Sequence, residues 1–182
     1  MNTVGRLTRA SALTLSVVLT GALGGVHLAS AASTSGVTAS YNSATIDLSQ
    51  GWGTAKVCAV TETGTYCFTT QNNYQVWLTT QSKLSGLSPA GSVGCSTALE
   101  LFQNISYGGN ELFIYVTSIW LNLSTYSFSD AVSSYKVGAC SISMTDAPYG
   151  AGNVYPGATS AGSDVSWIGT AWNDRVQSVY VY

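Results

Sequence analysis

Few side chains in this sequence are able to do acid–base, nucleophilic or metal chemistry. The 182 residues include eight acids, six Lys or Arg, four Cys and a single histidine, His27. A carboxylate pair could hydrolyse a glycosidic bond, but the eight acids are scattered singly and no motif pairs them. We therefore expect no catalytic residue and a protein that is not an enzyme. The remaining candidates are the cysteines and two Asp-containing turns.

The first 31 residues have the pattern of a signal peptide. Arg6 and Arg9 supply a positive start, residues 12–28 carry no Asp, Glu, Lys or Arg, and Ala29-Ser30-Ala31 is a small-x-small cleavage site. We place the cut after Ala31, with the bond after Ala32 as the alternative. A membrane anchor is the competing interpretation, but the apolar run is shorter than the about 20 residues that a spanning helix needs.

Cleavage at this site removes His27 and leaves 151 residues. A mature chain without histidine cannot build a Ser-His-Asp or Cys-His site, and it lacks the commonest zinc ligand. It keeps four basic residues against eight acids, a net charge of −4, which disfavours nucleic acid and anionic membranes as partners. We expect a secreted, extracellular monomer, free of the membrane after cleavage, whose partner is an extracellular protein or glycan.

The four cysteines are expected to form disulfides, because their number is even and the chain is exported. Three pairings are possible for Cys58, Cys67, Cys95 and Cys140. We favour Cys58–Cys67, which would close a hairpin around a turn at residues 62–64, together with Cys95–Cys140. The second bridge closes a loop of about 44 residues and is worth roughly 3–4 kcal/mol. Zinc is the alternative, but no CxxC spacing is present.

Residues 32–94 are predicted to form an N-terminal extension to a domain at 95–182. Residues 32–40 are small and polar and are expected to fray. A helix is predicted over 70–84, capped by Thr70, with an aromatic face that we assign to the core. Gly and Pro residues make 85–94 a linker. Apolar alternation and β-branched residues predict strands at 44–48, 57–60, 65–69, 98–102, 111–116, 133–137, 141–144 and 177–182.

The domain at 95–182 contains an internal repeat. Residues 129–137 align with 173–181 at an offset of 44, with four of nine positions identical. Upstream, residues 102–109 align with 144–151 at an offset of 42. Each unit opens with a strand, a Tyr and a glycine hairpin, and ends with an Asp-containing turn that leads into a strand.

These repeated features resemble the βγ-crystallin family, as in exported actinobacterial proteins and the βγ-crystallin-fold peptidase inhibitors. The Greek-key motif of that family has an aromatic, four residues, an aromatic, one residue and then Gly, which Phe102, Tyr107 and Gly109 match. The second unit departs from it, with Met144 for the first aromatic and Ala151 for the Gly, so its hairpin is expected to be distorted. The resemblance implies a mainly β fold: a double Greek-key sandwich, here with a disulfide-bonded N-terminal hairpin and one short helix.

The same resemblance implies candidate calcium ligands. Many microbial βγ-crystallins bind calcium through paired turns of the form Asn/Asp, Asn/Asp, two variable residues, Ser/Thr, Ser. Both turns here depart from that pattern, with Ser129 at its first position and Gln177 at its fifth. The alternative is that both turns are purely structural; calcium would bind weakly, at about 10⁻⁴–10⁻³ M. The candidate metal residues are Ser129, Asp130, Ala131, Ser133, Asn173, Asp174 and Arg175.

The sequence therefore predicts a secreted, non-enzymatic binding or structural module of βγ-crystallin type with weak calcium binding. One alternative is an extracellular peptidase inhibitor, directed at metalloproteases, with residues 147–164 as its loop. Another is a carbohydrate or cell-wall binding module that uses Trp120, Trp167 and Trp172, although such residues more often lie in the core. No further cofactor is expected.

Overall fold

The computed structural model describes residues 37–85 and 95–182. The predicted signal peptide at 1–31 and most of the predicted linker lie outside the described residues, so both stay predictions. Within these two ranges, no helix is long and apolar enough to cross a membrane.

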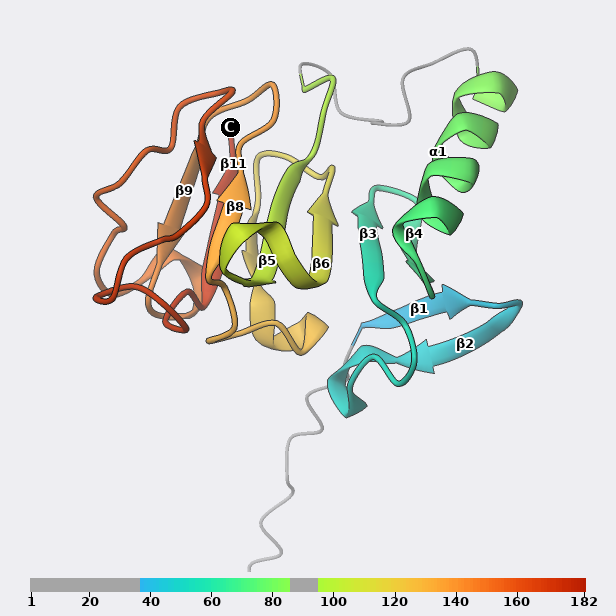
Figure 1. The fold of residues 1–182 in the computed structure, drawn as a ribbon, viewed down its shortest axis with the longest axis horizontal. Helices are drawn as coiled ribbons and strands as arrows, with labels where there is room; N and C mark the ends of the chain where they lie inside the picture. The colour runs from blue at the N-terminus through green and yellow to red at the C-terminus, as the bar shows by residue number, and fades with distance from the viewer. Residues whose placement is uncertain (1–36, 86–94) are drawn as a thin grey trace, which may run out of the picture. The chain divides into compact units, whose positions relative to one another are not determined.

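The described residues form two β-sheets and one α-helix, which confirms the mainly β fold class. The larger sheet has the order β10-β8-β5-β6-β3-β4-β1-β2 and the smaller the order β7-β11-β9 (Figure 1). The strands are β1 (Thr38–Tyr41), β2 (Ala44–Asp47), β3 (Val57–Thr61), β4 (Gly64–Phe68), β5 (Leu99–Asn104), β6 (Gly108–Ile114), β7 (Trp120–Asn122), β8 (Ser134–Lys136), β9 (Ile142–Thr145), β10 (Asp164–Val165) and β11 (Ser178–Val181). The helix is α1 (Gln71–Ser85), and short 3-10 helices are η1 (Leu48–Gln50), η2 (Ile105–Tyr107), η3 (Leu123–Tyr126) and η4 (Pro148–Gly150).

The two repeat units exchange strands, which makes the C-terminal segment a double Greek-key sandwich. In the first unit β5, β6 and β8 lie together in the larger sheet, while β7 pairs with β11 in the smaller sheet. In the second unit β9 pairs with β11 in the smaller sheet, while β10 pairs with β8 in the larger one. The first unit thus contributes β7 to the smaller sheet and the second unit contributes β10 to the larger one, so neither sheet is complete without both units.

A single apolar core fills the space between these sheets. Leu101, Leu112 and Ile114 reach it from the larger sheet, and Met144 and Val179 reach it from the smaller; all five are at most 1% exposed. Alternate residues of a strand point to opposite faces, so the intervening residues Glu100, Glu111 and Phe113 lie on the outer face of the larger sheet. The Cys95–Cys140 disulfide (Cα–Cα 5.4 Å) ties the start of the first unit to the start of the second.

The N-terminal extension continues the larger sheet past β6. Strand β3 pairs in parallel with β6, and β4 pairs antiparallel with β3. Cys58 lies directly opposite Cys67 in this hairpin, and the two form the predicted disulfide across a Cα–Cα distance of 4.1 Å. The division at residue 94 stays a prediction, since the larger sheet contains strands from both sides of it.

The expectation that residues 32–40 fray is wrong for the end of that segment. Residues 38–41 form β1, which pairs in parallel with β4 and antiparallel with β2. Ala39 is 2% exposed and belongs to the main core. The sheet edge left open by β4 explains this, because a strand edge with free backbone groups can order even a small, polar segment.

Helix α1 covers the outer face of the larger sheet. Thr70 caps it as predicted, with its hydroxyl accepting a hydrogen bond from the Asn73 backbone N–H at 3.2 Å. Tyr74 is 1% exposed and stacks on Phe113 at 4.1 Å between ring centroids. Its hydroxyl lies in a short hydrogen bond to that of Tyr115, and burial raises its pKa above the ordinary value. The aromatic face of the helix is therefore core, as predicted.

Candidate functional site

The two Asp-containing turns lie against each other and share backbone hydrogen bonds. The Asp130 N–H donates to the Val176 carbonyl at 3.0 Å, and the Asp174 N–H donates to the Val132 carbonyl at 3.1 Å. Both aspartates have a positive φ, 54° and 55°, a conformation that Asp tolerates better than most residues. The structure thus brings the two predicted turns together as a near-symmetric pair, which we call the paired turns (residues 129–134 and 173–178).

The last residue of each turn is structural in both units. The Ser134 hydroxyl donates to the Asn104 carbonyl at 2.6 Å and accepts from the Tyr107 N–H at 3.0 Å. Ser178 makes a similar pair of bonds, shifted by one residue relative to the first unit, with the Ala147 carbonyl at 2.8 Å and the Gly150 N–H at 2.9 Å. Both serines are fully buried. Each therefore ties the closing strand of its unit to the hairpin that opens the unit.

The hairpins themselves differ, as the departure at Ala151 predicts. In the first unit Gly109 has a φ of 81°. The residue aligned with it, Ala151, has a φ of −79°, and the positive angles fall instead on its neighbours Gly150 (76°) and Gly152 (77°). The chain thus avoids a left-handed alanine, and the flanking glycines take the positive angles instead.

The two aspartates have different neighbours at the fifth position of the opposite turn. Beside Asp174 lies the Ser133 hydroxyl, 3.4 Å from its carboxylate. The Asn173 amide donates to the other carboxylate oxygen at 2.6 Å. Ser133 is 5% exposed, so its hydroxyl is held in place. A carboxylate, a hydroxyl and nearby backbone carbonyls are oxygen ligands of the kind calcium prefers, so this half of the pair fits the ion.

The half at Asp130 does not fit a cation. The Gln177 side-chain amide donates to both of its carboxylate oxygens, at 3.2 and 3.3 Å, and the Ser129 hydroxyl donates at 3.3 Å. The Asp130 carboxylate therefore faces the Gln177 amide N–H, whereas the Asp174 carboxylate faces the Ser133 hydroxyl. Ala131 has no polar side-chain atom to add.

Arg175 is turned away from both aspartates. Its guanidinium contacts the Asp146 carboxylate at 2.8 Å and the Ala171 carbonyl at 3.0 Å. Its positive charge is therefore directed at Asp146, and the place of Arg175 among the candidate metal residues stays a prediction. Among residues 37–85 and 95–182, no three His, Cys, Asp or Glu side chains gather as a metal cluster.

The tryptophans proposed as sugar-stacking residues differ in exposure. The Trp120 ring packs on Tyr180 with 5.4 Å between centroids, and a Cβ added at Gly150 would lie 2.3 Å from it. Trp172 packs edge-on against Tyr155 at 5.3 Å. Trp167 is 55% exposed. Of the three, Trp167 alone presents most of its ring to solvent.

The predicted inhibitor loop at 147–164 begins with a tied hairpin. The Asp146 carboxylate accepts hydrogen bonds from the Asn153 backbone N–H at 2.6 Å and its side-chain amide at 2.9 Å. These bonds, with the Arg175 charge, lower the pKa of Asp146. Tyr149 is 76% exposed at the tip. The tip is therefore both anchored and accessible.

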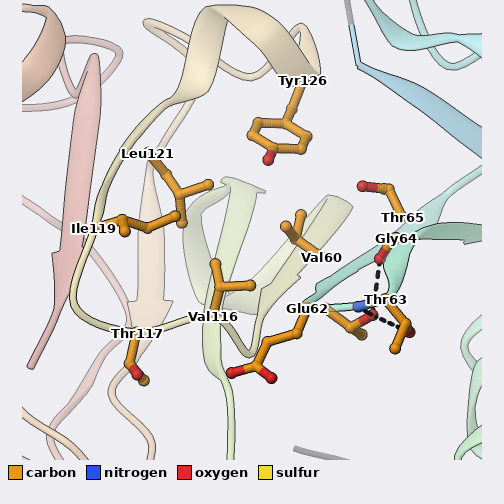
Figure 2. A pocket seen from close by; sticks show the side chains of 11 residues that line it. Val60, Glu62, Thr63, Gly64, Thr65, Val116, Thr117, Ile119, Leu121 and Tyr126 are labelled. Atoms are coloured by element: carbon orange, nitrogen blue, oxygen red, sulfur yellow. Dashed lines mark hydrogen bonds between the residues drawn. The ribbon is translucent and has the colours of Figure 1, made fainter. Parts of the chain in front are cut away.

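Two cavities on the larger sheet were not foreseen from the sequence. Figure 2 shows one of them, of about 570 Å³, between the β3–β4 hairpin and the segment after β6. Its walls are the aliphatic side chains of Val60, Val116 and Leu121, and the Thr61 hydroxyl bonds the Gly64 carbonyl at its rim. The other lies beside the start of α1 and contains Glu100 and Glu111. No sequence motif pairs these two acids; they meet because β5 and β6 pair with Phe102 opposite Glu111.

Comparison with known proteins places the likeness in about half of the chain. No family model matches the sequence, and no curated protein matches it. A βγ-crystallin domain from Clostridium beijerinckii is 23% identical, with a TM-score of 0.39 over 47% of this chain and 97% of its own. A βγ-crystallin from Ciona intestinalis is 23% identical, with a TM-score of 0.38 over 47% and 99%. A structure from a study of the evolution of the eye lens βγ-crystallin fold is 21% identical, with a TM-score of 0.43 over 50% and 90%.

Proposed function

We propose that this protein, whose C-terminal half is a βγ-crystallin-like segment, is an exported, non-enzymatic binding and structural module that holds one calcium ion weakly. Two disulfides join all four cysteines, and such bonds persist mainly in oxidising, extracellular compartments. After the predicted cleavage the chain contains no histidine, which supports a role other than catalysis.

The observation that carries the proposal is the difference between the two halves of the paired turns. Asp174 faces a buried hydroxyl, that of Ser133, whereas Asp130 faces the amide of Gln177. Calcium requires oxygen ligands. The Asn173 amide donates to only one oxygen of Asp174, whereas the Gln177 amide lies between both oxygens of Asp130 and so occupies the position of a cation there. The ion is therefore assigned to Ser133 and Asp174, with backbone carbonyls of the turns completing its shell.

One carboxylate makes a weak site. Affinity for calcium rises with the number of charged ligands, and extracellular modules with few of them bind in the range of about 10⁻⁴–10⁻³ M. The bound ion would supply charge neutralisation between the turns and would stabilise the sandwich, since both units contribute to each turn contact.

Thermal unfolding of the oxidised, exported protein tests this proposal. At about 5 mM calcium, roughly ten times a dissociation constant of ~0.5 mM, the ion adds about 1.4 kcal/mol and raises Tm by about 3–5 °C relative to excess chelator. The matched variants are Asp174→Asn and Asp130→Asn, which keep the side-chain shape and the tolerance for positive φ. The Asp174 variant should lose the calcium-dependent shift, and the Asp130 variant should keep it. An equal shift in all three proteins would contradict the assignment.

A second candidate function, inhibition of extracellular peptidases, is favoured by the anchored hairpin after Asp146. An inhibitory loop must be accessible and resist cleavage, and Tyr149 at its tip is 76% exposed while Asn153 is tied back to Asp146. The test is residual activity of a zinc metalloprotease and a serine protease at an equimolar ratio. Full activity with both removes this candidate, and inhibition lost in Tyr149→Ala supports it.

A further inference from the structure

A polar pocket of about 570 Å³ lies on the outer face of the larger sheet, beside the first turn of α1. Strands β5, β6 and β8 form its base, and the helix forms one wall. We call it the sheet pocket. Its polar lining residues are Lys56, Gln71, Gln75, Glu100, Tyr107, Glu111 and Lys136.

One of its two carboxylates is already paired. The Lys136 ammonium lies 3.7 Å from Glu100. It also lies over the Tyr107 ring at 4.8 Å and the Phe102 ring at 5.7 Å. These contacts hold Lys136 along one side of the pocket, so the charge of Glu100 is compensated within the protein.

The other carboxylate, that of Glu111, makes no ion pair among the described residues of the kind that joins Glu100 to Lys136. Glu111 is 8% exposed, and the charge of Lys136 acts on it only as a weaker attraction. Burial, together with the charge of Glu100, raises its pKa to about 7. Among the described residues no fully buried side-chain oxygen or nitrogen is without a hydrogen-bond partner, so the Glu111 oxygens face the pocket and its water. A ligand hydroxyl can donate to them in place of that water.

The charge and chemistry of the lining select the kind of ligand. Two lysines and two glutamates sum to zero when Glu111 is ionised and to +1 when it is protonated, so the lining gives neither an anion nor a cation a strong net attraction. The exposed amides of Gln71 and Gln75 both donate and accept hydrogen bonds. The cavity of Figure 2 has an aliphatic lining instead. A neutral ligand with many hydroxyl groups fits the sheet pocket, because carboxyl, amide and ammonium groups all bond hydroxyls.

We propose that the sheet pocket binds a neutral saccharide unit, with Glu111 accepting from its hydroxyls and with Gln75 and Lys136 bonding further hydroxyls. This site is distinct from the paired turns and requires none of Trp120, Trp167 and Trp172. Saccharide binding in the sheet pocket does not depend on calcium binding at the paired turns.

The experiment is a calorimetric titration of the oxidised protein, in excess chelator, with chitotetraose, cellotetraose and maltotetraose, and with spermidine as a cationic probe. We expect saturable binding of at least one tetrasaccharide and none of spermidine. Binding should be at least tenfold weaker in Glu111→Leu, because a hydrogen bond to a charged or buried carboxyl is lost. No binding of any tetrasaccharide, or saturable binding of spermidine instead, would overturn the proposal.

A second variant distinguishes a loss of saccharide binding from a loss of folding. Gln75→Ala changes an exposed helix residue that lines the pocket, and it should weaken saccharide binding several-fold at unchanged Tm. Asn72→Ala changes an exposed neighbour on the same helix that does not line the pocket, and it should bind like the wild type. Equal affinity in all these variants would place the saccharide elsewhere and contradict the assignment.

Discussion

The paired turns and the sheet pocket each hold two carboxylates, but the two regions differ in how many contacts those carboxylates make within the protein. In the turns every aspartate accepts hydrogen bonds from its own and the opposite turn. In the pocket Glu100 forms an ion pair with Lys136, while the carboxylate of Glu111 faces the pocket. The first arrangement stabilises the fold, and the second places an acceptor group where a ligand can reach it.

The largest expected effect concerns the ionisation of Glu111. Its folded pKa of about 7 lies above the ordinary 4.5, so folding disfavours the charged form. Stability is then highest at low pH and falls as pH rises from the unfolded pKa to the folded one. Because solvent in the pocket screens part of this effect, we expect the wild type to lose about 2 kcal/mol at most between roughly pH 5 and pH 8 through this group. Glu100, Lys136 and Lys56 are the charged groups around it.

Glu111→Gln should remove most of that loss, measured by urea unfolding at both pH values. Glu62, exposed at the tip of the β3–β4 hairpin, supplies the control, because Glu62→Gln should leave the pH profile unchanged. A wild-type profile that is flat over this range would mean that Glu111 finds a partner in solution.

The next effect tests whether the two repeat units share one framework. Ser134→Ala and Ser178→Ala each remove two part-buried hydrogen bonds, one to a backbone carbonyl and one from a backbone N–H. Each should cost about 1–3 kcal/mol in urea unfolding. Ser124→Ala, at an exposed position, should stay within about 0.5 kcal/mol. A large cost in one unit alone would mean that the two units are not equivalent.

The smallest effect sharpens the contrast within the paired turns. Gln177→Ser replaces the amide beside Asp130 by a hydroxyl, as Ser133 provides beside Asp174. We expect a second, weak calcium site and up to about 1 kcal/mol of added stabilisation at millimolar calcium. Ser133→Ala is the opposite change and should remove the first site. An unchanged calcium response in Gln177→Ser would show that the amide does not exclude the ion.

Much of the fold could be predicted from local patterns and from the repeat. The spacing of Cys58 and Cys67 indicated a hairpin, Thr70 indicated the start of a helix, and Phe102, Tyr107 and Gly109 indicated a Greek key. The strands β7 and β10 were missed because they are three and two residues long, too short to show alternation. Strand β1 was missed because its order comes from pairing with β4.

The two candidate sites also differ in how far the sequence alone identifies their residues. The paired turns repeat a motif, so the sequence identified Asp130 and Asp174. The neighbours of the two aspartates differ because the packing of one turn on the other places Gln177 beside Asp130 and Ser133 beside Asp174. Glu100 and Glu111 are eleven positions apart with no motif between them. Only the antiparallel pairing of β5 with β6 brings them onto one face.

The most direct test of the central claim is the number of calcium ions bound per chain, measured by titration of the oxidised, chelator-treated protein. The account predicts one weak ion, lost in Asp174→Asn and retained in Asp130→Asn. Two ions of similar affinity, or none at millimolar calcium, would contradict it.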